Sequence, residues 1–127
     1  MKKALILYNS KAGGGHVERR LDAIAGIFRE GEYDVLIRRI AFDANPFDEA
    51  ETHTVDLVVV CGGDGTVNYV LNAMKAHTLD LTLGIIPAGT ANDFARALGM
   101  SKDPVVAARQ IATGSIERID CGRVNDL

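Results

Sequence analysis

The chain has 127 residues, of which 47% are hydrophobic and 24% charged, so we expect one globular domain with enough apolar residues for a core. The formal net charge of −3 gives no overall basic field for nucleic acid or anionic lipid. No apolar run approaches membrane-spanning length, and Cys61 and Cys121 are the only cysteines. These features predict a cytoplasmic protein with two reduced, buried thiols and no transmembrane segment.

Apolar periodicity alternates between strand-like and helix-like segments from end to end. In chain order it predicts a strand at 4–8, a helix over 17–28 that Gly31 would end, strands at 33–40 and 56–61, a helix at 66–76, a strand at 81–86, helices at 91–98 and 104–112, and a strand at 116–121. Asp103 is the expected N-cap of the last helix, with Pro104 at its first position. Repeated βα units predict a mostly parallel sheet covered on both faces.

The most informative segment is Gly62-Gly63-Asp64-Gly65-Thr66, which directly follows a continuous apolar run. With the helical spacing after it, this segment predicts a strand, a glycine-rich turn and a helix. The glycines would permit positive φ and a close backbone approach to a ligand, and the N–H groups that open a helix favour anions. Asp is also an ordinary turn residue, but we interpret the segment as a phosphate cradle whose carboxylate handles a metal ion or a proton.

Two further loops are predicted to reach the same edge of the sheet. They are Asn9-Ser10-Lys11-Ala12-Gly13-Gly14-Gly15 and Pro87-Ala88-Gly89-Thr90-Ala91-Asn92-Asp93. In an open parallel sheet, ligands bind outside the carboxyl ends of the strands. Three loops of small residues at one edge therefore predict a ligand site there.

Several polar residues of these loops have simpler explanations. Asp93 could simply interact with the dipole of the helix that it begins, and Arg96 could form an ion pair on the helix surface. Lys11 could be an ordinary solvent-exposed lysine in a loop. The convergence of the loops favours a functional role for Asp93 and Arg96, and both explanations of Lys11 stay open. Neither glycine-rich loop contains G-x-G-x-x-G or G-K-[ST], which excludes the common dinucleotide-binding and P-loop types.

These residues resemble the catalytic domain of the diacylglycerol kinase family of lipid kinases, which includes soluble bacterial members and the sphingosine and ceramide kinases. The resemblance extends over nearly the whole chain. The segment 62–66 is shared with NAD kinases, whereas the segment 84–96, GIIPAGTANDFAR, is similar to a second signature of the lipid kinases. The pair implies an α/β three-layer sandwich with a mostly parallel, Rossmann-like sheet, of the type found in the N-terminal domains of NAD kinases and diacylglycerol kinases.

The resemblance implies an ATP-dependent lipid kinase that uses Mg²⁺. It implies that Asp64 serves the phosphates and Mg²⁺, that Asp93 and Arg96 line the active-site cleft, and that Asp120 belongs to an acid network near a domain junction. The residues implied to hold ATP are Asn9, Ser10, Lys11, Ala12, Gly13, Gly62, Gly63, Asp64, Gly65, Thr66, Asn68, Gly89 and Thr90. Ser10 and Tyr69 depart from the family pattern, which often has Pro and Glu at these positions.

The resemblance also implies a second, β-rich domain that helps to form the lipid site and carries the general base. We therefore expect residues 1–121 to form the nucleotide-binding domain and residues 122–127 to begin the second domain, which this chain lacks. The intact protein would meet its lipid substrate by peripheral association with a membrane surface. The junction around 119–124 would be exposed in this chain, which leaves room for a homodimer.

Two other functions remain open from the sequence. An NAD kinase would share the segment 62–66, although the sequence Asn92-Asp93-Phe94-Ala95-Arg96 argues against it. A nucleotide-binding regulatory module without catalysis would share the whole predicted site. Transfer from ATP to diacylglycerol, rather than to NAD, would distinguish the lipid kinase from both.

Overall fold

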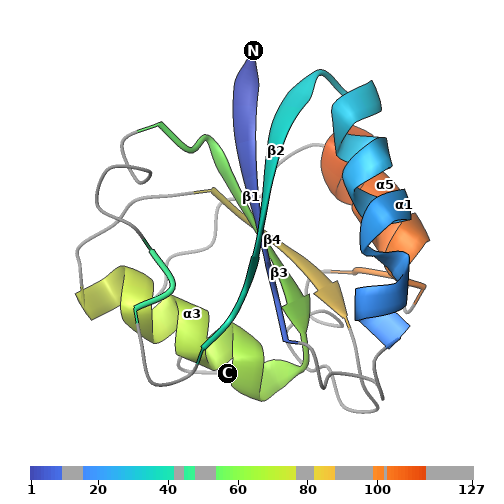
Figure 1. The fold of residues 1–127 in the computed structure, drawn as a ribbon. Helices are drawn as coiled ribbons and strands as arrows, with labels where there is room; N and C mark the ends of the chain where they lie inside the picture. Colours follow the sequence, from blue (N-terminus) through green and yellow to red (C-terminus); the bar gives the residue numbers. More distant parts are fainter. Residues whose placement is uncertain are drawn as a thin grey trace.

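The computed structural model describes residues 1–9, 16–41, 45–47, 54–76, 82–87, 99–101 and 103–113. Over these residues the elements are β1 (Lys2–Tyr8), α1 (His16–Glu30), β2 (Tyr33–Arg39), β3 (Leu57–Gly62), α3 (Asp64–Ala76), β4 (Thr82–Pro87) and α5 (Pro104–Thr113). The strands form one sheet in the order β2-β1-β3-β4, and every pairing is parallel. Helices α1 and α5 cover one face of the sheet and α3 covers the other (Figure 1). The predicted α/β three-layer, Rossmann-like fold is confirmed.

The core consists of two apolar layers because side chains alternate between the two faces of each strand. In β1, Ala4 and Ile6 pack toward α1 and α5, whereas Leu5 and Leu7 pack toward α3. All six residues of β3 are buried, as expected for a central strand of a sheet covered on both faces. The central strands β1 and β3 therefore lie between the two helical layers.

Helix α5 lies against β4 at a glycine. A Cβ added to Gly84 would lie 2.9 Å from Cδ1 and Cγ2 of Ile111. Only a residue without a side chain lets Ile111 approach the strand this closely. The start of α5 agrees with the sequence prediction, because Oδ1 of Asp103 accepts hydrogen bonds from the N–H groups of Val105 at 2.9 Å and Val106 at 3.4 Å.

The end of α1 differs in detail from the prediction. The helix stops at Glu30 and Gly31 follows it, but the residue with positive φ is Glu32, at 68°. The N–H of Glu32 donates to the carbonyl oxygen of Arg29 at 3.1 Å. A glutamate thus occupies the left-handed conformation that glycine usually takes at helix ends.

The predicted bounds of the described strands and of the first and last described helices lie within about two residues of the observed ones, which is the usual uncertainty at element ends. The predicted helix 91–98, the predicted strand 116–121 and most of the segment 42–53 lie outside the described residues. Within the described part of the chain, no helix has both the length and the apolarity needed to cross a membrane.

Candidate functional site

The order of the strands creates a switch point between β1 and β3. From β1, the chain passes through α1 on one face to β2, whereas β3 is followed by α3 on the opposite face. At the carboxyl ends of the two strands Tyr8 pairs with Cys61, and the N–H of Asn9 donates to the carbonyl oxygen of Cys61 at 3.2 Å. Ligands of open α/β sheets bind outside such a point, so the topology places the candidate site at Asn9 and the segment after β3.

Asn9 and Thr66 join the two sides of this point. Nδ2 of Asn9 donates to Oγ1 of Thr66 at 3.4 Å, a long hydrogen bond in a half-buried position. Thr66 lies in the first turn of α3 and is only 5% exposed. Two residues that lie 57 positions apart, both predicted to hold ATP, therefore lie side by side.

Gly62 is required by packing. A Cβ at this position would lie 2.7 Å from Cβ of Thr66 and 2.8 Å from both Oγ1 and Cγ2, which is closer than nonbonded carbon atoms approach. The expectation of positive φ in this segment is wrong for Gly62 and Gly65; among the described residues, Glu32 and Gly99 have positive φ. The glycine at 62 makes room for Thr66 and does not provide an unusual backbone angle.

Helix α3 begins at Asp64, two residues before the predicted start at Thr66. The carbonyl oxygen of Gly63 accepts the first helical hydrogen bond, from the N–H of Val67 at 3.1 Å, so Gly63 occupies the N-cap position. The prediction placed Asp64 and Gly65 in the glycine-rich turn between the strand and the helix. In the helix, the carboxylate of Asp64 instead lies beside the positive end of the helix dipole.

The N-cap residue leaves the start of α3 suited to an anion. The first N–H groups of an α-helix have no partner within the helix, and Ser, Thr, Asp or Asn at the N-cap normally accepts a hydrogen bond from one of them. Gly63 has no side chain for this purpose. The first turn of α3, from Asp64 to Thr66, therefore presents backbone donors at the switch point, where an oxyanion such as phosphate can accept them.

Asp64 is the predicted metal ligand. Its side chain is half-buried, Gly65 and Asn68 are exposed, and no group of three or more His, Cys, Asp or Glu side chains gathers within the described part of the chain. Mg²⁺ is typically held by one or two carboxylates together with substrate phosphates and water. A carboxylate beside the start of a helix is compatible with that kind of site, and not with a cage made by the described residues alone.

Strand β4, which precedes the third predicted loop, ends at the same edge of the sheet. Pro87, the last residue of β4, pairs in register with Gly62, so the chain enters the segment after β4 next to the glycine-rich segment. The other predicted site residues lie outside the described residues, namely Ser10, Lys11, Ala12, Gly13, Gly89, Thr90, Asp93, Arg96 and Asp120.

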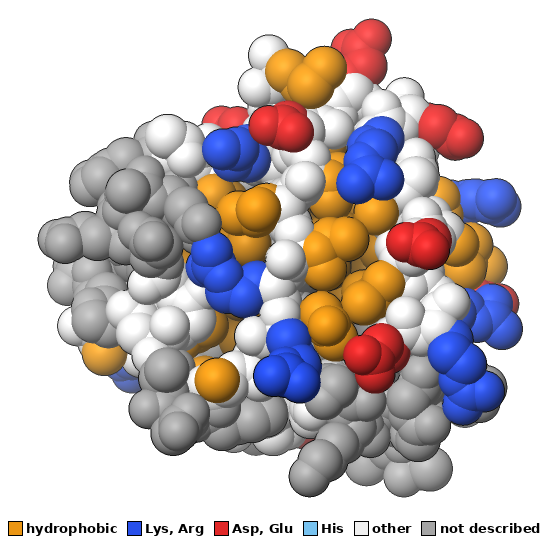
Figure 2. Space-filling model, viewed as in Figure 1, with side chains coloured by type: hydrophobic (Ala, Val, Ile, Leu, Met, Phe, Trp, Pro, Cys, Tyr) orange, Lys and Arg blue, Asp and Glu red, His pale blue; other side chains and the backbone are white. Residues whose placement is uncertain are grey.

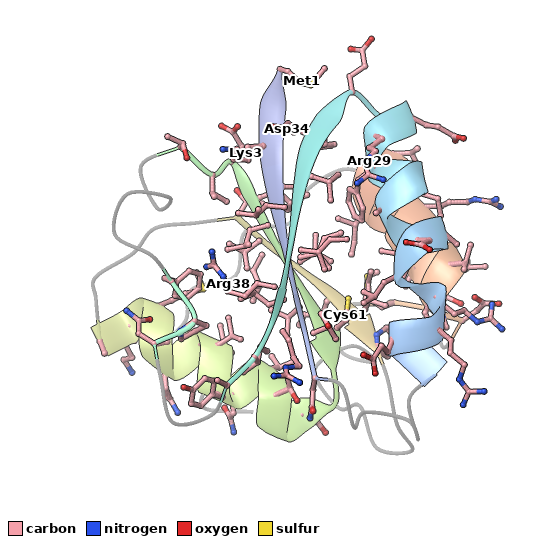
Figure 3. All side chains as sticks on the ribbon, viewed as in Figure 1. Met1, Lys3, Arg29, Asp34, Arg38 and Cys61 are labelled. Atoms are coloured by element: carbon pink, nitrogen blue, oxygen red, sulfur yellow. The ribbon has the colours of Figure 1, made fainter. Side chains whose placement is uncertain are left out.

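Cys61 lies directly before the glycine-rich segment, with its side chain on the α1 and α5 side of the sheet (Figure 3). It is a free thiol with no exposed surface, as predicted, and burial raises its pKa from 9.0 to about 12. A thiol that stays protonated at neutral pH is a poor nucleophile, so Cys61 is part of the core. Cys121 lies outside the described residues.

Tyr69 makes a contact that the sequence did not indicate. Its hydroxyl donates to the carbonyl oxygen of Ala41 at 3.2 Å, which connects α3 to the segment after β2. The sequence marked Tyr69 only as a departure from the family pattern. A contact between residues 28 positions apart has no local signal, because it depends on how α3 crosses the sheet.

Comparisons with known proteins agree with this architecture. Residues 3–124 match the family model of the diacylglycerol kinase catalytic domain. A diacylglycerol kinase of Bacillus subtilis (strain 168) is 37% identical over 129 residues, which cover 98% of this chain and 43% of the relative. A diacylglycerol kinase of Staphylococcus aureus (strain MRSA252) is 34% identical over 128 residues, which cover 98% and 41%.

The fold is also found among solved structures. The crystal structure of a diacylglycerol kinase from Bacillus anthracis str. Sterne matches with a TM-score of 0.72 and 34% identity, over 87% of this chain and 39% of that chain. The chain thus spans about two fifths of the length of the relatives that it matches.

Proposed function

Because the chain belongs to the family of the diacylglycerol kinase catalytic domain, we propose that it forms the ATP-binding part of a lipid kinase. The complete enzyme transfers the γ-phosphoryl group of ATP to a lipid hydroxyl, most simply converting diacylglycerol to phosphatidate at a membrane surface. The observation that carries this proposal is the start of α3, with Gly63 at its N-cap, beside the Asn9–Thr66 hydrogen bond at the switch point.

Each described residue of the site has a role in this proposal. The N–H groups of Asp64, Gly65 and Thr66 bind phosphate oxygens, and the Asn9–Thr66 hydrogen bond connects the end of β1 to the first turn of α3. Asp64 holds Mg²⁺, which when bound neutralises charge on the phosphates. Asn68, one turn further along α3, contacts ATP from the exposed side of the helix. In phosphoryl transfer the protein contributes mainly such positioning and electrostatic stabilisation.

The reaction also needs groups that we assign to other residues. The lipid oxygen forms a bond to the γ-phosphorus, the bond from that phosphorus to the β,γ-bridging oxygen breaks, and ADP leaves. A base accepts the hydroxyl proton, and we assign it to a second, β-rich domain that begins at about residue 122. The relatives extend well beyond the matched region, which supports this division. Asp93, Arg96 and Asp120 complete the catalytic cleft in the proposal.

The test replaces the carboxylate of Asp64 with an amide of the same shape. In the complete protein, with labelled ATP and diacylglycerol in mixed micelles, we expect Asp64→Asn to lower kcat by about 100-fold or more, as loss of a group that stabilises the transition state does. Its free energy of unfolding should fall by less than about 1 kcal/mol, because the amide keeps the shape of the side chain and a charge beside the start of a helix typically contributes no more than that.

Asp22→Asn is the matched control, because Asp22 is exposed on α1, away from the switch point, and we expect it to retain normal turnover. Wild-type turnover in Asp64→Asn would refute the role of this carboxylate. Labelled product from NAD, with none from diacylglycerol, would refute the lipid kinase, and absence of transfer to either acceptor with intact ATP binding would favour a regulatory module.

A further inference from the structure

Helix α3 is attached near its start to two other segments. Oγ1 of Thr66 accepts a hydrogen bond from Nδ2 of Asn9 at 3.4 Å, which connects the helix to the end of β1. Three residues later, the hydroxyl of Tyr69 donates to the carbonyl oxygen of Ala41 at 3.2 Å, which connects the helix to the segment after β2. Residues three apart are neighbours on the surface of a helix, so both attachments belong to one side of α3.

The segments at the other ends of these two hydrogen bonds are also joined. The N–H of Ile40, the residue before Ala41, donates to the carbonyl oxygen of Tyr8 at 2.8 Å, and Tyr8 directly precedes Asn9. The contacts therefore form a closed circuit from β1 to α3, along α3 by one turn, across to the segment after β2 and back to β1. Figure 1 shows the end of β2 next to α3, at the edge of the sheet where the candidate site lies.

Tyr69 combines an apolar ring with a polar end, as tyrosine commonly does where one side is apolar and the other wet. Its side chain is half-buried and packs against the core layer between α3 and the sheet, which also contains Ile40. The hydrogen bond of its hydroxyl lies in an exposed position. Figure 2 shows the face of the molecule on which β2 lies, where apolar side chains lie at the surface between charged ones. Water competes for a hydrogen bond in such a position, so loss of the hydroxyl should leave the fold intact.

We propose that Tyr69 is a positioning residue of the nucleotide site, an inference that rests on the proposed function. Asn9 and the backbone donors at the start of α3 can bind one phosphate chain only if the helix keeps a fixed tilt and rotation relative to β1. Apolar packing has no preferred direction, whereas two hydrogen bonds joined in a circuit restrain both movements. Misplacement by about 1 Å, caused by a change far from the chemistry, can cost about 100-fold in rate, so a contact outside the site can affect the binding of ATP.

Removal of the hydroxyl alone tests this role in the complete protein. We expect Tyr69→Phe to raise KM for ATP by about three- to tenfold, the range that corresponds to one ordinary hydrogen bond, and to change KM for diacylglycerol by less than about twofold. The phenylalanine ring keeps the packing of Tyr69, so the variant should fold. Tyr33→Phe is the matched control, because Tyr33 is also half-buried but pairs with Lys2 at the opposite edge of the sheet. Both KM values of this control should stay at the wild-type level.

A double-mutant cycle tests whether Tyr69 acts through the Asn9–Thr66 hydrogen bond. In an Asn9→Ala background the circuit is already open, so Tyr69→Phe should change KM for ATP by less than about twofold. Equal effects of Tyr69→Phe in the two backgrounds would refute this route. In the nucleotide-free protein, the side-chain amide resonances of Asn9 should shift in Tyr69→Phe and not in Tyr33→Phe. A tyrosine that contributes only packing would not produce this difference, because both variants keep their rings.

The outcomes distinguish a failure of this inference from a failure of the proposed function. Normal turnover of diacylglycerol by the wild-type protein, with an unchanged KM for ATP in Tyr69→Phe, would refute the positioning role and leave the lipid kinase standing. A parallel rise of KM for ATP and for diacylglycerol would indicate a general structural defect and would also refute it. If the wild-type protein transfers no phosphate to diacylglycerol, the proposed function fails. The affinity for ATP in calorimetry and the Asn9 resonances then decide whether Tyr69 positions α3.

Discussion

At the scale of single residues, Gly62 and Gly65 belong to the same glycine-rich segment but have different physical roles. Gly62 is buried under Thr66, whose side chain occupies the space where a Cβ would be, whereas an added Cβ at Gly65 would meet nothing within 4 Å. The sequence does not distinguish these glycines, because both belong to one short glycine-rich segment between a strand and a helix. Their difference comes from the position of α3 over the end of β3.

We predict that Gly62→Ala destabilises the protein by about 1–3 kcal/mol, the range for overpacking a buried site. The atoms that clash are Cβ and its two substituents on Thr66, which move only if the start of α3 moves. The Asn9–Thr66 hydrogen bond should be lost with this movement. Urea unfolding measures the stability, and the chemical shift of the Asn9 side-chain amide reports the bond.

Gly65→Ala is the matched comparison in the same segment. Replacing an exposed glycine within a helix by alanine stabilises by roughly 0.5–1 kcal/mol, so this variant should be at least as stable as the wild type. If its N–H binds phosphate, the added methyl group should still weaken ATP binding in calorimetry. Equal stability losses in the two variants would contradict the packing role of Gly62.

At the scale of elements, the turn between α1 and β2 contains strain at an unexpected residue. The chain has Gly31 available, yet the left-handed conformation falls on Glu32. Gly31 has an ordinary φ, and its Cβ would approach the carbonyl oxygen of Phe28 to 3.4 Å, a normal contact distance. The register of β2 against β1, with Tyr33 opposite Lys2, determines where the chain must turn.

We predict that Glu32→Gly stabilises the protein by up to about 1 kcal/mol. The substitution removes the strain of a non-glycine residue in the left-handed conformation, and this gain exceeds the entropic cost of a more flexible unfolded chain. Gly31→Ala should change stability by less than about 0.5 kcal/mol. Thermal unfolding of both variants checks the pair. A loss of stability in Glu32→Gly would show that the Glu32 side chain contributes more than its backbone strain costs.

The elements also show what the sequence can predict. Apolar runs and the helical spacing of apolar residues identified every described strand and helix, and Asp103 marked the start of α5, because these signals arise within a few residues of chain. The same local signals predicted a start of α3 two residues after the observed one. They also did not predict the contacts of Thr66 with Asn9 and of Ile111 with Gly84. Such contacts join residues far apart in the chain, so only the packed layers determine them.

At the scale of the whole molecule, Cys61 reports on the entire fold. It lies in the central strand β3, covered by α1 and α5, and is fully buried. Thiol reagents can reach Cys61 only when the layers separate, so the rate at which they label it should follow global unfolding. In a Cys121→Ser background, we therefore expect labelling of native protein by a thiol reagent at about pH 8 to be very slow and to accelerate with urea as the folded fraction falls.

The raised pKa of Cys61 also makes global stability depend on pH. Burial raises this pKa from 9.0 to about 12. Below pH 9.0 the thiol is protonated in both states, but between 9.0 and about 12 it ionises only in the unfolded chain, so the free energy of unfolding should fall as pH rises through that window. The measurement is the difference in the free energy of unfolding between the wild-type protein and Cys61→Ala, which isolates the contribution of this thiol. That variant is expected to be less stable than the wild type at about pH 8 because of the cavity it creates. The difference in free energy of unfolding between the two proteins should become smaller toward about pH 10. A stability difference that does not change with pH, together with rapid labelling of the native protein, would show that the thiol is accessible to solvent and that β3 is not buried between the helical layers.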